Sequence, residues 1–396
     1  MKTETQTAVI IIPTYNEADN IGKMIDYLNT KTFPSLDKKW QMKILVVDDN
    51  SPDGTGKIVT EKTKQYPQTT FLLARTAKTG LGSAYADGFK YAMEQLKADF
   101  VFEFDADFQH PPETIPSMLQ AMDDGYDYVI GSRKIRGGAE PEGRDFIRTI
   151  MTEGGGFVAR FILFFPFKHF WDVTDPTTGL KVTRVKGFVD KMDLSPDHFY
   201  SRKFGYKVQW LAETLSMGAK FKEVPLKFAN RTEGASKFES DTTNEILISC
   251  VKTRWFDPFI QKFLKFGIVG GFGFVVNTLG AKIFKSLLIT PESNISLLNG
   301  ICNAMAAELA IISNFIWNNV WTFASEKITS VSQIITKFIT FNLSSLITGV
   351  VIPSVVISLL TSIFGDKLFL YQVIAIFGLT IPLNWFVYNK FIWKKK

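Results

Sequence analysis

Oxygen-bearing side chains follow directly on a short apolar run. The run 100–104 leads into DADFQ, which contributes Asp105, Asp107 and Gln109. If the chain stays extended there, these three side chains point to one side. Hard oxygen donors of this kind suit Mg²⁺ or Mn²⁺, which keep positions open for a diphosphate. A lone D-x-D is also common as an acidic capping loop, so the prediction of a metal site depends on companion motifs.

Two such companions occur at the ends of other apolar runs. PTYNE starts at Pro13 after the run 8–12, and DDNSPD starts at Asp48 after the run 43–47. Because parallel strands gather their carboxyl ends at one edge, where such sheets bind ligands, the three motifs are expected to meet there.

The side chains of these two motifs suit a nucleoside. A base needs an aromatic or apolar wall, and the ribose and base N–H groups need carboxylates. Tyr15, Glu17 and Asp49 can supply these features. The simpler interpretation of Asn16 and Glu17 is capping of the next helix. For Asp53 we favour a turn.

The elements that must position these motifs alternate along the first part of the chain. Apolar runs predict five strands, at 8–12, 43–47, 71–74, 100–104 and 128–130. Helices are predicted at 17–28 and 81–96. Strands that alternate with helices indicate an α/β domain with a mostly parallel, Rossmann-like sheet.

The segment 154–171 is aromatic and apolar but is interrupted by Arg160, Pro166 and Lys168. It is too interrupted to cross a bilayer. It is expected either to lie on a membrane surface as an amphipathic segment or to be a buried core helix. A second surface helix, over 246–263, would join the two halves of the chain.

The composition of the second half of the chain is typical of segments that cross a lipid bilayer. The chain has 396 residues and 36 phenylalanines, and charges become rare beyond about residue 262. Since one crossing needs about 20 apolar residues, four spans are predicted, at 266–289, 295–323, 335–364 and 368–391. The expected organisation is a catalytic domain at 1–240, an interfacial linker at 241–262 and an all-α membrane domain at 263–396.

Charge sets the expected orientation. The net charge is +6, and lysines flank the spans on one predicted face, at Lys262, Lys265, Lys327, Lys337 and 394–396. The positive-inside rule makes this face, and the catalytic domain, cytoplasmic, although Lys282 and Lys285 reduce the asymmetry. Two cysteines form no disulfide framework. No motif for binding nucleic acid is present.

Glu308 lies in the middle of the second predicted span. A carboxylate at that depth is costly. It is expected either to line a polar path for lipid headgroups or to pair within the bundle, with Lys282, Asn303 or Asn277.

The motifs taken together resemble a known family. PTYNE, VVDDNSPDGT, KTGLGSAYADGF and DADFQHPPE, in this order, resemble glycosyltransferase family 2, in particular the dolichyl- and polyprenyl-phosphate mannosyl- and glucosyltransferases. Further matches over about 8–237 are Arg133 in IGSR, DPTTG from Asp175, EVP from Glu223, and the segment from Asn230 to Lys237. FLKFGIVGG and SNFIWNNVWTF resemble the GtrA-like membrane domain found in some of these synthases.

The resemblance implies a GT-A fold and a set of site residues. It implies that the nucleoside is bound by Pro13, Tyr15, Glu17, Val47 and Asp49. It implies that the nucleotide sugar contacts Asp105, Ala106 and Asp107, with Asp107 and Gln109 on the metal. It implies that phosphates are faced by Arg133, Arg231 and Lys237, with Arg148 as a weaker match for the acceptor phosphate.

The implied reaction is inverting transfer of mannose from GDP-mannose to dolichyl or polyprenyl phosphate, giving a lipid-linked sugar for glycosylation. Transfer from UDP-glucose is the alternative. The acceptor needs no general base, because a phosphate monoester with a second pKa near 6 is largely a dianion at neutral pH. Arg133, Arg148, Arg231 and Lys237 would screen its charge. His110 is expected to order the loop after Asp107 rather than to titrate.

Two other classes compete with this prediction. A processive polysaccharide synthase would carry Q-x-x-R-W, whereas Arg254 and Trp255 follow VKT without the glutamine. A non-catalytic translocase or binding protein for lipid-linked sugars would have no need of Asp105, Asp107 and Gln109.

Overall fold

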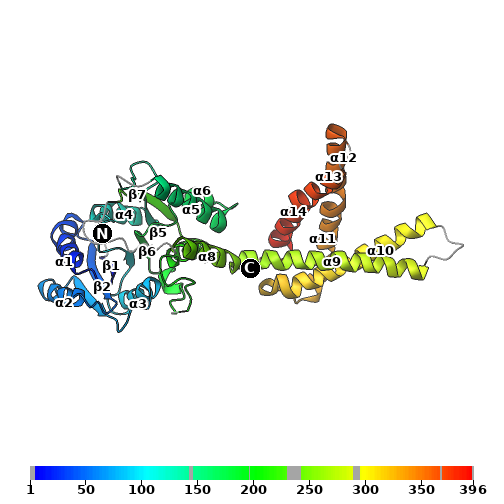
Figure 1. Cartoon of the computed structure of the whole chain (residues 1–396). Coiled ribbons are helices and arrows are strands. Elements are labelled where there is room, and N and C mark those ends of the chain that lie inside the picture. Colours follow the sequence, from blue (N-terminus) through cyan, green and yellow to red (C-terminus); the bar gives the residue numbers. More distant parts are fainter. Residues whose placement is uncertain are drawn as a thin grey trace. The chain divides into compact units, whose positions relative to one another are not determined.

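The chain folds into two compact units, Met1–Trp255 and Phe256–Lys396. The structure is a computed structural model that describes residues 5–141, 146–195, 197–229, 242–288, 295–365 and 368–394. The first unit contains a β-sheet covered by helices, and the described part of the second is helical (Figure 1).

One seven-stranded sheet organises the first unit, in the order β3-β2-β1-β4-β6-β5-β7. The strands are β1 (Gln6–Thr14), β2 (Trp40–Asp48), β3 (Thr70–Ala74), β4 (Phe100–Glu103), β5 (Tyr128–Ser132), β6 (Lys181–Arg184) and β7 (Phe221–Pro225). Of these described strands, only β6 runs antiparallel to its neighbours. The predicted α/β class with a mostly parallel sheet is confirmed, and each of the five predicted strands overlaps an observed one.

Two strands, β6 and β7, were not predicted from the sequence. β6 has the sequence KVTR and β7 has FKEVP, so neither contains the apolar run that marks a buried strand. Lys181 of β6 is fully buried and is accommodated because its Nζ donates to the Lys207 carbonyl at 2.6 Å. A tertiary hydrogen bond therefore permits a strand that local pattern does not predict.

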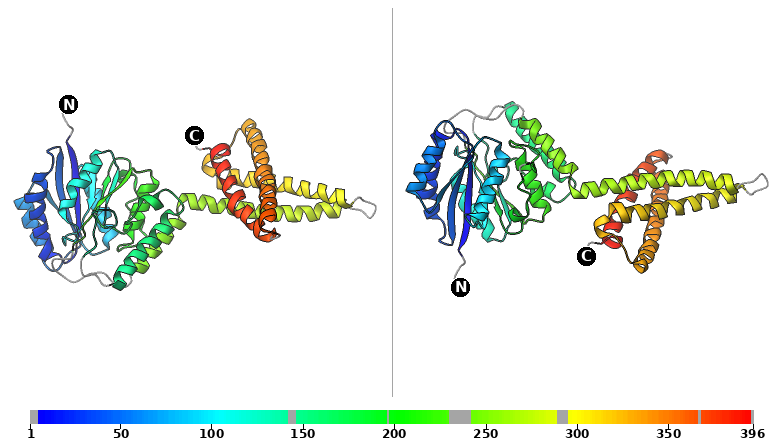
Figure 2. Two further views of the ribbon diagram at one scale, coloured as in Figure 1. Left: turned by 90° about the horizontal axis from the view of Figure 1, so that it is seen from above. Right: turned by 90° about the horizontal axis from the view of Figure 1, so that it is seen from below.

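Helices cover both faces of the sheet (Figure 2). They are α1 (Ala18–Tyr27), α2 (Thr55–Gln65), α3 (Leu81–Glu94), α4 (Ile115–Asp123), α5 (Phe146–Phe164), α6 (His169–Asp172), α7 (Tyr206–Ser216) and α8 (Thr242–Trp255). Apolar side chains of α1, α2 and α4 join the core on one face, and those of α3, α5, α7 and α8 join the core on the other.

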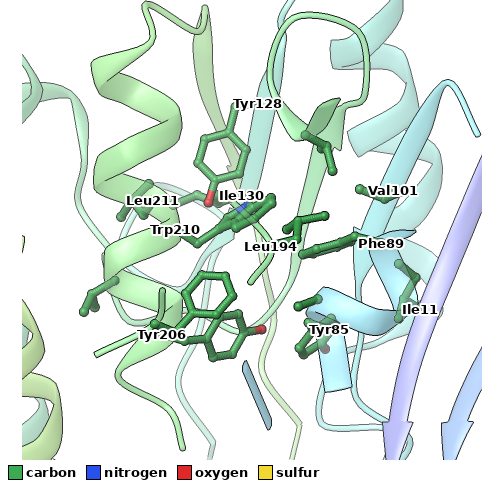
Figure 3. Close-up of a cluster of buried hydrophobic side chains, with 14 of the residues drawn as sticks. Ile11, Tyr85, Phe89, Val101, Tyr128, Ile130, Leu194, Tyr206, Trp210 and Leu211 are labelled. Atoms are coloured by element: carbon green, nitrogen blue, oxygen red, sulfur yellow. The ribbon is translucent and has the colours of Figure 1, made fainter. Parts of the chain in front are cut away.

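Strand alternation explains why both faces are apolar. Val9 and Ile11 of β1 enter one core while Ile10 and Ile12 enter the other. The core beside α3 and α7 is aromatic: the rings of Tyr85 and Tyr206 stack at 5.4 Å (Figure 3). This packing fixes the sheet on which the candidate site is built.

The aromatic segment 154–171 forms part of α5 and α6. Leu163 and Phe164 are buried in the core, whereas Phe157, Phe161 and Trp171 are exposed, Trp171 by 72%. One side of the segment therefore packs on the core, as the core-helix alternative predicted, and the other side presents exposed aromatic rings, while its position on a membrane surface stays a prediction.

The helix predicted over 246–263 is interrupted. α8 ends at Trp255, and Cys250 is fully buried in the core of the first unit. A new helix, α9 (Pro258–Leu288), starts three residues later. The Asp257 carboxylate accepts the N–H of Phe259 at 2.9 Å and caps α9, and proline is favoured at a first helical position.

The described part of the second unit contains four helical segments long and apolar enough to cross a membrane: Pro258–Leu288, Leu298–Thr322, Val331–Phe364 and Leu370–Ile392. They comprise α9, α10 (Ile295–Trp317), α11 (Val331–Leu346), α12 (Ile352–Phe364), α13 (Leu368–Ala375) and α14 (Ile381–Val387). Short π-helical segments continue several of these helices. α9 and α10 lie side by side as a long antiparallel pair (Figure 2). The four predicted spans are confirmed as apolar helices.

Glu308 of α10 pairs within this unit. Its carboxylate accepts a hydrogen bond from the Asn342 side chain of α11 at 2.6 Å. The partner therefore differs from Lys282, Asn303 and Asn277, because the tertiary packing brings α11 to this side of α10. Pairing between helices, one of the two alternatives, is what the structure contains.

Candidate active site

Three motif-bearing loops meet at one edge of the sheet. β1 and β2 are parallel, with Pro13 beside Val47 and Thr14 beside Asp48. β4 flanks β1 on the other side, with Glu103 beside Ile11. The loops that follow these strands therefore leave the sheet next to one another, as the sequence predicted for PTYNE, DDNSPD and DADFQ.

Asp49 lies in a charged setting that the sequence did not reveal. Arg75, which directly follows β3, forms an ion pair with Asp49 and a second one with Asp87 at 3.0 Å. Burial raises the pKa of Asp49, and the attraction of Arg75 opposes that rise. Lys78 Nζ lies 4.1 Å from the centre of the Tyr15 ring. The sequence feature that could have predicted the roles of Arg75 and Lys78 was the presence of basic residues just after the end of β3.

Asp53 orders the loop, as predicted. Its carboxylate accepts the backbone N–H of Ala18 at 3.0 Å and that of Thr55 at 3.0 Å.

Glu17 precedes α1, but its side chain makes no capping hydrogen bond to this helix, which lies wholly within the described residues. The Glu17 carboxylate instead accepts from the Asn20 side chain at 3.0 Å. The capping alternative for Glu17 is therefore wrong.

The DADFQ segment is a turn. Phe108 has φ of 60°, a left-handed conformation that reverses the chain. Asp107 accepts the backbone N–H of Gln109 at 3.1 Å, and the Gln109 carbonyl accepts the N–H of Ala229 at 3.1 Å. The chain is therefore not extended through Asp105, Asp107 and Gln109, because the strand ends at Glu103 and a turn follows it.

The residues of this turn nevertheless fit a divalent cation. Asp107 is buried and Asp105 is about one-third exposed. Within the described ranges no group of three His, Cys, Asp or Glu side chains forms a complete metal cage. Mg²⁺ is commonly held by only one or two carboxylates together with substrate phosphates, so a pair of aspartates after a strand matches that chemistry.

The buried ammonium group of Lys207 lies close to the Asp105 carboxylate. The Lys207 side chain is 2% exposed, its Nζ is 3.7 Å from an Asp105 carboxylate oxygen, and this Nζ makes no hydrogen bond in the described part of the chain. A Cβ on Gly179 would lie 2.5 Å from the His110 ring and 2.7 Å from Lys207 Nζ, so a larger residue there would displace these side chains. Burial lowers the pKa of His110 to about 4, which agrees with the expectation that it does not titrate near neutral pH.

We expect Lys207→Met to raise the KM for the nucleotide sugar that the family resemblance implies about tenfold, with a smaller change in kcat. Methionine keeps most of the volume but removes the charge that attracts Asp105, and a hydrogen bond or ion contact to a charged group contributes roughly 1.5 kcal/mol. Steady-state kinetics measures the change. Lys43→Met is the control, since Lys43 donates to the Leu96 carbonyl instead. An unchanged KM in Lys207→Met, or an equal rise in the control, contradicts the prediction.

A pocket of about 440 Å³ opens beside β5. It is lined by Arg133, Lys134, Glu153, Gly154, Gly156, Phe157, Arg160, Thr174, Asp175, Pro176 and Thr177. Its cations suit a phosphate, and Phe157 belongs to the exposed aromatic side of α5. Lys134 and Arg160 were not predicted as site residues from the sequence. The signals available were a second basic residue after IGSR and an arginine interrupting an apolar helix.

Arg133 is held by a forked ion pair. Its Nε and Nη2 donate to the two carboxylate oxygens of Asp175 at 2.7 and 2.6 Å. Although burial alone would lower the pKa of Arg133, the bonds to Asp175 keep that pKa above its ordinary value. A guanidinium has five N–H donors, so this pairing leaves donors for a ligand.

Glu223 of the EVP motif anchors the loop that carries Asp175. Its carboxylate accepts the backbone N–H of Thr174 at 2.7 Å and that of Asp175 at 3.2 Å. It also accepts the Thr174 hydroxyl. Burial raises the pKa of Glu223, and these hydrogen bonds oppose the rise. Glu223 thus positions the residues that hold Arg133.

One aromatic ring joins the pocket to the DADFQ turn. Phe228 lies 5.5 Å from the Arg133 guanidinium and 5.4 Å from the His110 ring. The next residue, Ala229, is the one bonded to Gln109. The pocket and the acidic turn are therefore neighbours. Arg231 and Lys237 lie outside the described residues, as does the side chain of Arg148.

Comparison with known proteins agrees with this arrangement. Residues 9–188 match the family described as glycosyl transferase family 2, and residues 265–393 match the GtrA/DPMS transmembrane domain. The family match and the fold thus define a GT-A glycosyltransferase, and the match to the membrane domain defines an integral membrane protein.

Curated relatives identify the family more narrowly. The dolichol-phosphate mannosyltransferase of Pyrococcus furiosus is 34% identical over 83% of this chain and 84% of its own length. The polyprenol monophosphomannose synthase of Mycolicibacterium smegmatis is 33% identical over 61% of this chain and 85% of its own. The undecaprenyl-phosphate mannosyltransferase of Micrococcus luteus is 34% identical over 62% of this chain and 92% of its own length. The chain belongs to the dolichol- and polyprenol-phosphate mannosyltransferase group of glycosyltransferase family 2.

Proposed function

We propose that this protein transfers mannose from GDP-mannose to the phosphate of dolichyl or polyprenyl phosphate, with inversion at C1. The observation that carries the proposal is the cationic pocket with Arg133, which adjoins the acidic turn through Phe228. A phosphate acceptor and a diphosphate donor would each have a suitable place. The names of the three relatives support mannose as the sugar.

The donor would lie along the edge formed by β1, β2 and β4. We propose that the nucleoside contacts Pro13, Tyr15, Glu17, Val47 and Asp49, and that the sugar diphosphate contacts Asp105, Ala106 and Asp107. Asp107 and Gln109 would hold Mg²⁺ or Mn²⁺. Such a cation neutralises negative charge as the nucleotide leaves.

The acceptor would lie in the pocket beside β5. Its phosphate is largely a dianion at neutral pH and can attack the sugar directly. The pocket carboxylates are engaged already, Asp175 by Arg133 and Glu153 by Lys134, which supports a reaction without a general base. We propose that Arg133, Arg148, Arg231 and Lys237 screen the acceptor charge. Arg231 follows Ala229, the neighbour of Gln109, by two residues.

We further propose that the transferase unit faces the cytoplasm, with 241–262 as the join to the membrane domain. In a chain that crosses the membrane four times, the segments carrying Lys262, Lys265, Lys327, Lys337, Lys390 and Lys394 would share one membrane face. Lysine excess marks the cytoplasmic side. Protease digestion of sealed membrane vesicles, prepared in both orientations, tests this orientation. If protease added outside intact cells cleaves the transferase unit, the proposed orientation is wrong.

Transfer is tested with the full chain in detergent, Mn²⁺ and a short polyprenyl phosphate. Radiolabelled GDP-mannose and UDP-glucose are supplied separately, each with and without a chelator. We expect label in the lipid from GDP-mannose only, and no transfer with the chelator. Transfer from UDP-glucose alone favours a glucosyltransferase. No transfer from either donor by folded protein favours a translocase or binding protein.

A further inference from the structure

The second unit has a pocket of its own at the ends of its spans. Its volume is about 340 Å³, and it is lined by Lys262, Glu326, Asn389, Lys390, Trp393 and Lys394. Lys262 lies in the first turns of the first span, Glu326 follows the second span, and Lys394 follows the fourth. A chain that crosses four times brings these three points to the same membrane face. The pocket is therefore placed at a membrane boundary.

Ring stacking and hydrogen bonds hold the residues at the base of this pocket in place. Trp393 is 1% exposed, and its ring stacks on Phe323 at 4.5 Å. Its indole N–H donates to the Asn319 side-chain oxygen at 2.9 Å, and the same oxygen accepts the N–H of Ile328 at 2.8 Å. Lys262 Nζ lies 4.3 Å from the centre of the Phe323 ring. The segments after the second and fourth spans are thus tied together beneath the pocket.

The charges around the pocket are unbalanced. Lys262 is neutralised by Glu326, whose carboxylate lies 3.1 Å away and is almost fully buried. Among the residues that the structure describes, Lys390 and Lys394 have no ion-pair partner. Three lysines against one glutamate leave an excess of two positive charges at the mouth of the pocket. An anion is the complementary ligand.

Exposed aromatic rings next to these charges narrow the choice of anion. Lys390 Nζ lies 5.1 Å from the ring centre of Phe386 and 5.8 Å from that of Phe391. Both rings are 51% exposed. A ligand that satisfies both features has an anionic head and an apolar tail, which is the chemistry of an anionic membrane lipid.

We propose that this pocket binds the phosphate headgroup of an anionic membrane lipid, through Lys390 and Lys394, with acyl chains along Phe386 and Phe391. Trp393 and the Lys262–Glu326 pair shape the floor. The site lies wholly in the second unit and is independent of the transferase activity proposed above.

The test uses native mass spectrometry of the full chain in a neutral detergent. Phosphatidylglycerol, phosphatidylcholine, a short polyprenyl phosphate and inorganic phosphate are added separately. We expect retention of phosphatidylglycerol over phosphatidylcholine, and about a thirtyfold loss of that retention in Lys390→Gln/Lys394→Gln, because two lysines at about 1 kcal/mol each correspond to this factor. Retention of the polyprenyl phosphate that depends on the same two lysines also supports the proposal, since this lipid carries an anionic phosphate and an apolar tail.

Lys282→Gln/Lys285→Gln is the matched control, since it removes two charges from the opposite end of α9. It is expected to retain phosphatidylglycerol as the wild type does. Equal retention by Lys390→Gln/Lys394→Gln and the wild type, or an equal loss in the control, overturns the proposal. Displacement of the lipid by inorganic phosphate at equal concentration overturns it as well, because the site would then recognise phosphate without the tail.

Discussion

Replacing Asp107 by asparagine or alanine is expected to lower kcat for mannosyl transfer about a thousandfold. Asp107 is 4% exposed in the turn after β4, and it is the proposed protein carboxylate on the cation. A divalent ion provides several kcal/mol of charge stabilisation, and about 4 kcal/mol corresponds to this factor. Asparagine keeps the oxygen that accepts the Gln109 N–H at 3.1 Å, so the turn is preserved while the charge is removed.

The measurement is transfer of labelled mannose at saturating Mn²⁺, together with the thermal unfolding of each variant. Asp123→Asn serves as the control, because Asp123 ends α4 and pairs with Lys39 away from the three motifs. The control is expected to keep wild-type activity. If Asp107→Asn retains most of the activity, the role of Asp107 is limited to holding the turn, and the proposed metal site is wrong.

Breaking the pair of Arg133 with Asp175 is expected to have the second large effect. The side chains are 10% and 1% exposed. Removing one partner of a buried pair costs roughly 3–5 kcal/mol, because the other charge is left without its counterion. Asp175→Ala is therefore expected to lower the unfolding temperature markedly and to reduce transfer by about a hundredfold or more.

A double variant separates the structural role of the pair from its function. In Arg133→Met/Asp175→Leu both charges are gone, and apolar replacement of a buried pair is often neutral for stability. We expect the unfolding temperature to recover toward that of the wild type while transfer stays low, since the guanidinium proposed for the phosphate is missing. Recovery of transfer along with stability would show that Arg133 has only a structural role.

Local patterns predicted the parts of the fold that rest on continuous apolar runs. The core strand AVIII is buried on both sides, with Val9 and Ile10 in opposite cores. Such a run predicts a strand whatever surrounds it. The four spans were equally clear, because a bilayer requires about 20 apolar residues in succession.

Three other features were not predicted from the local sequence. β6 contains the buried Lys181, whose Nζ donates to the carbonyl of the distant Lys207. The break between α8 and α9 at Asp257 could have been predicted from the proline that follows but was missed, because the flanking residues continue the helical pattern. The turn at Phe108 also departs from the extended geometry that alternation suggested.

The sequence by itself determined the class of the protein and the chemical types in its site. Carboxylates after β4 and lysine-flanked apolar spans are properties of neighbouring residues, so they can be recognised without coordinates. Only the tertiary structure decided which charges meet: Arg75 with Asp49, Lys207 with Asp105, and Asp175 with Arg133, held in place by Glu223. These partners are far apart along the chain, and the strand order that brings them together is set by packing of the whole sheet.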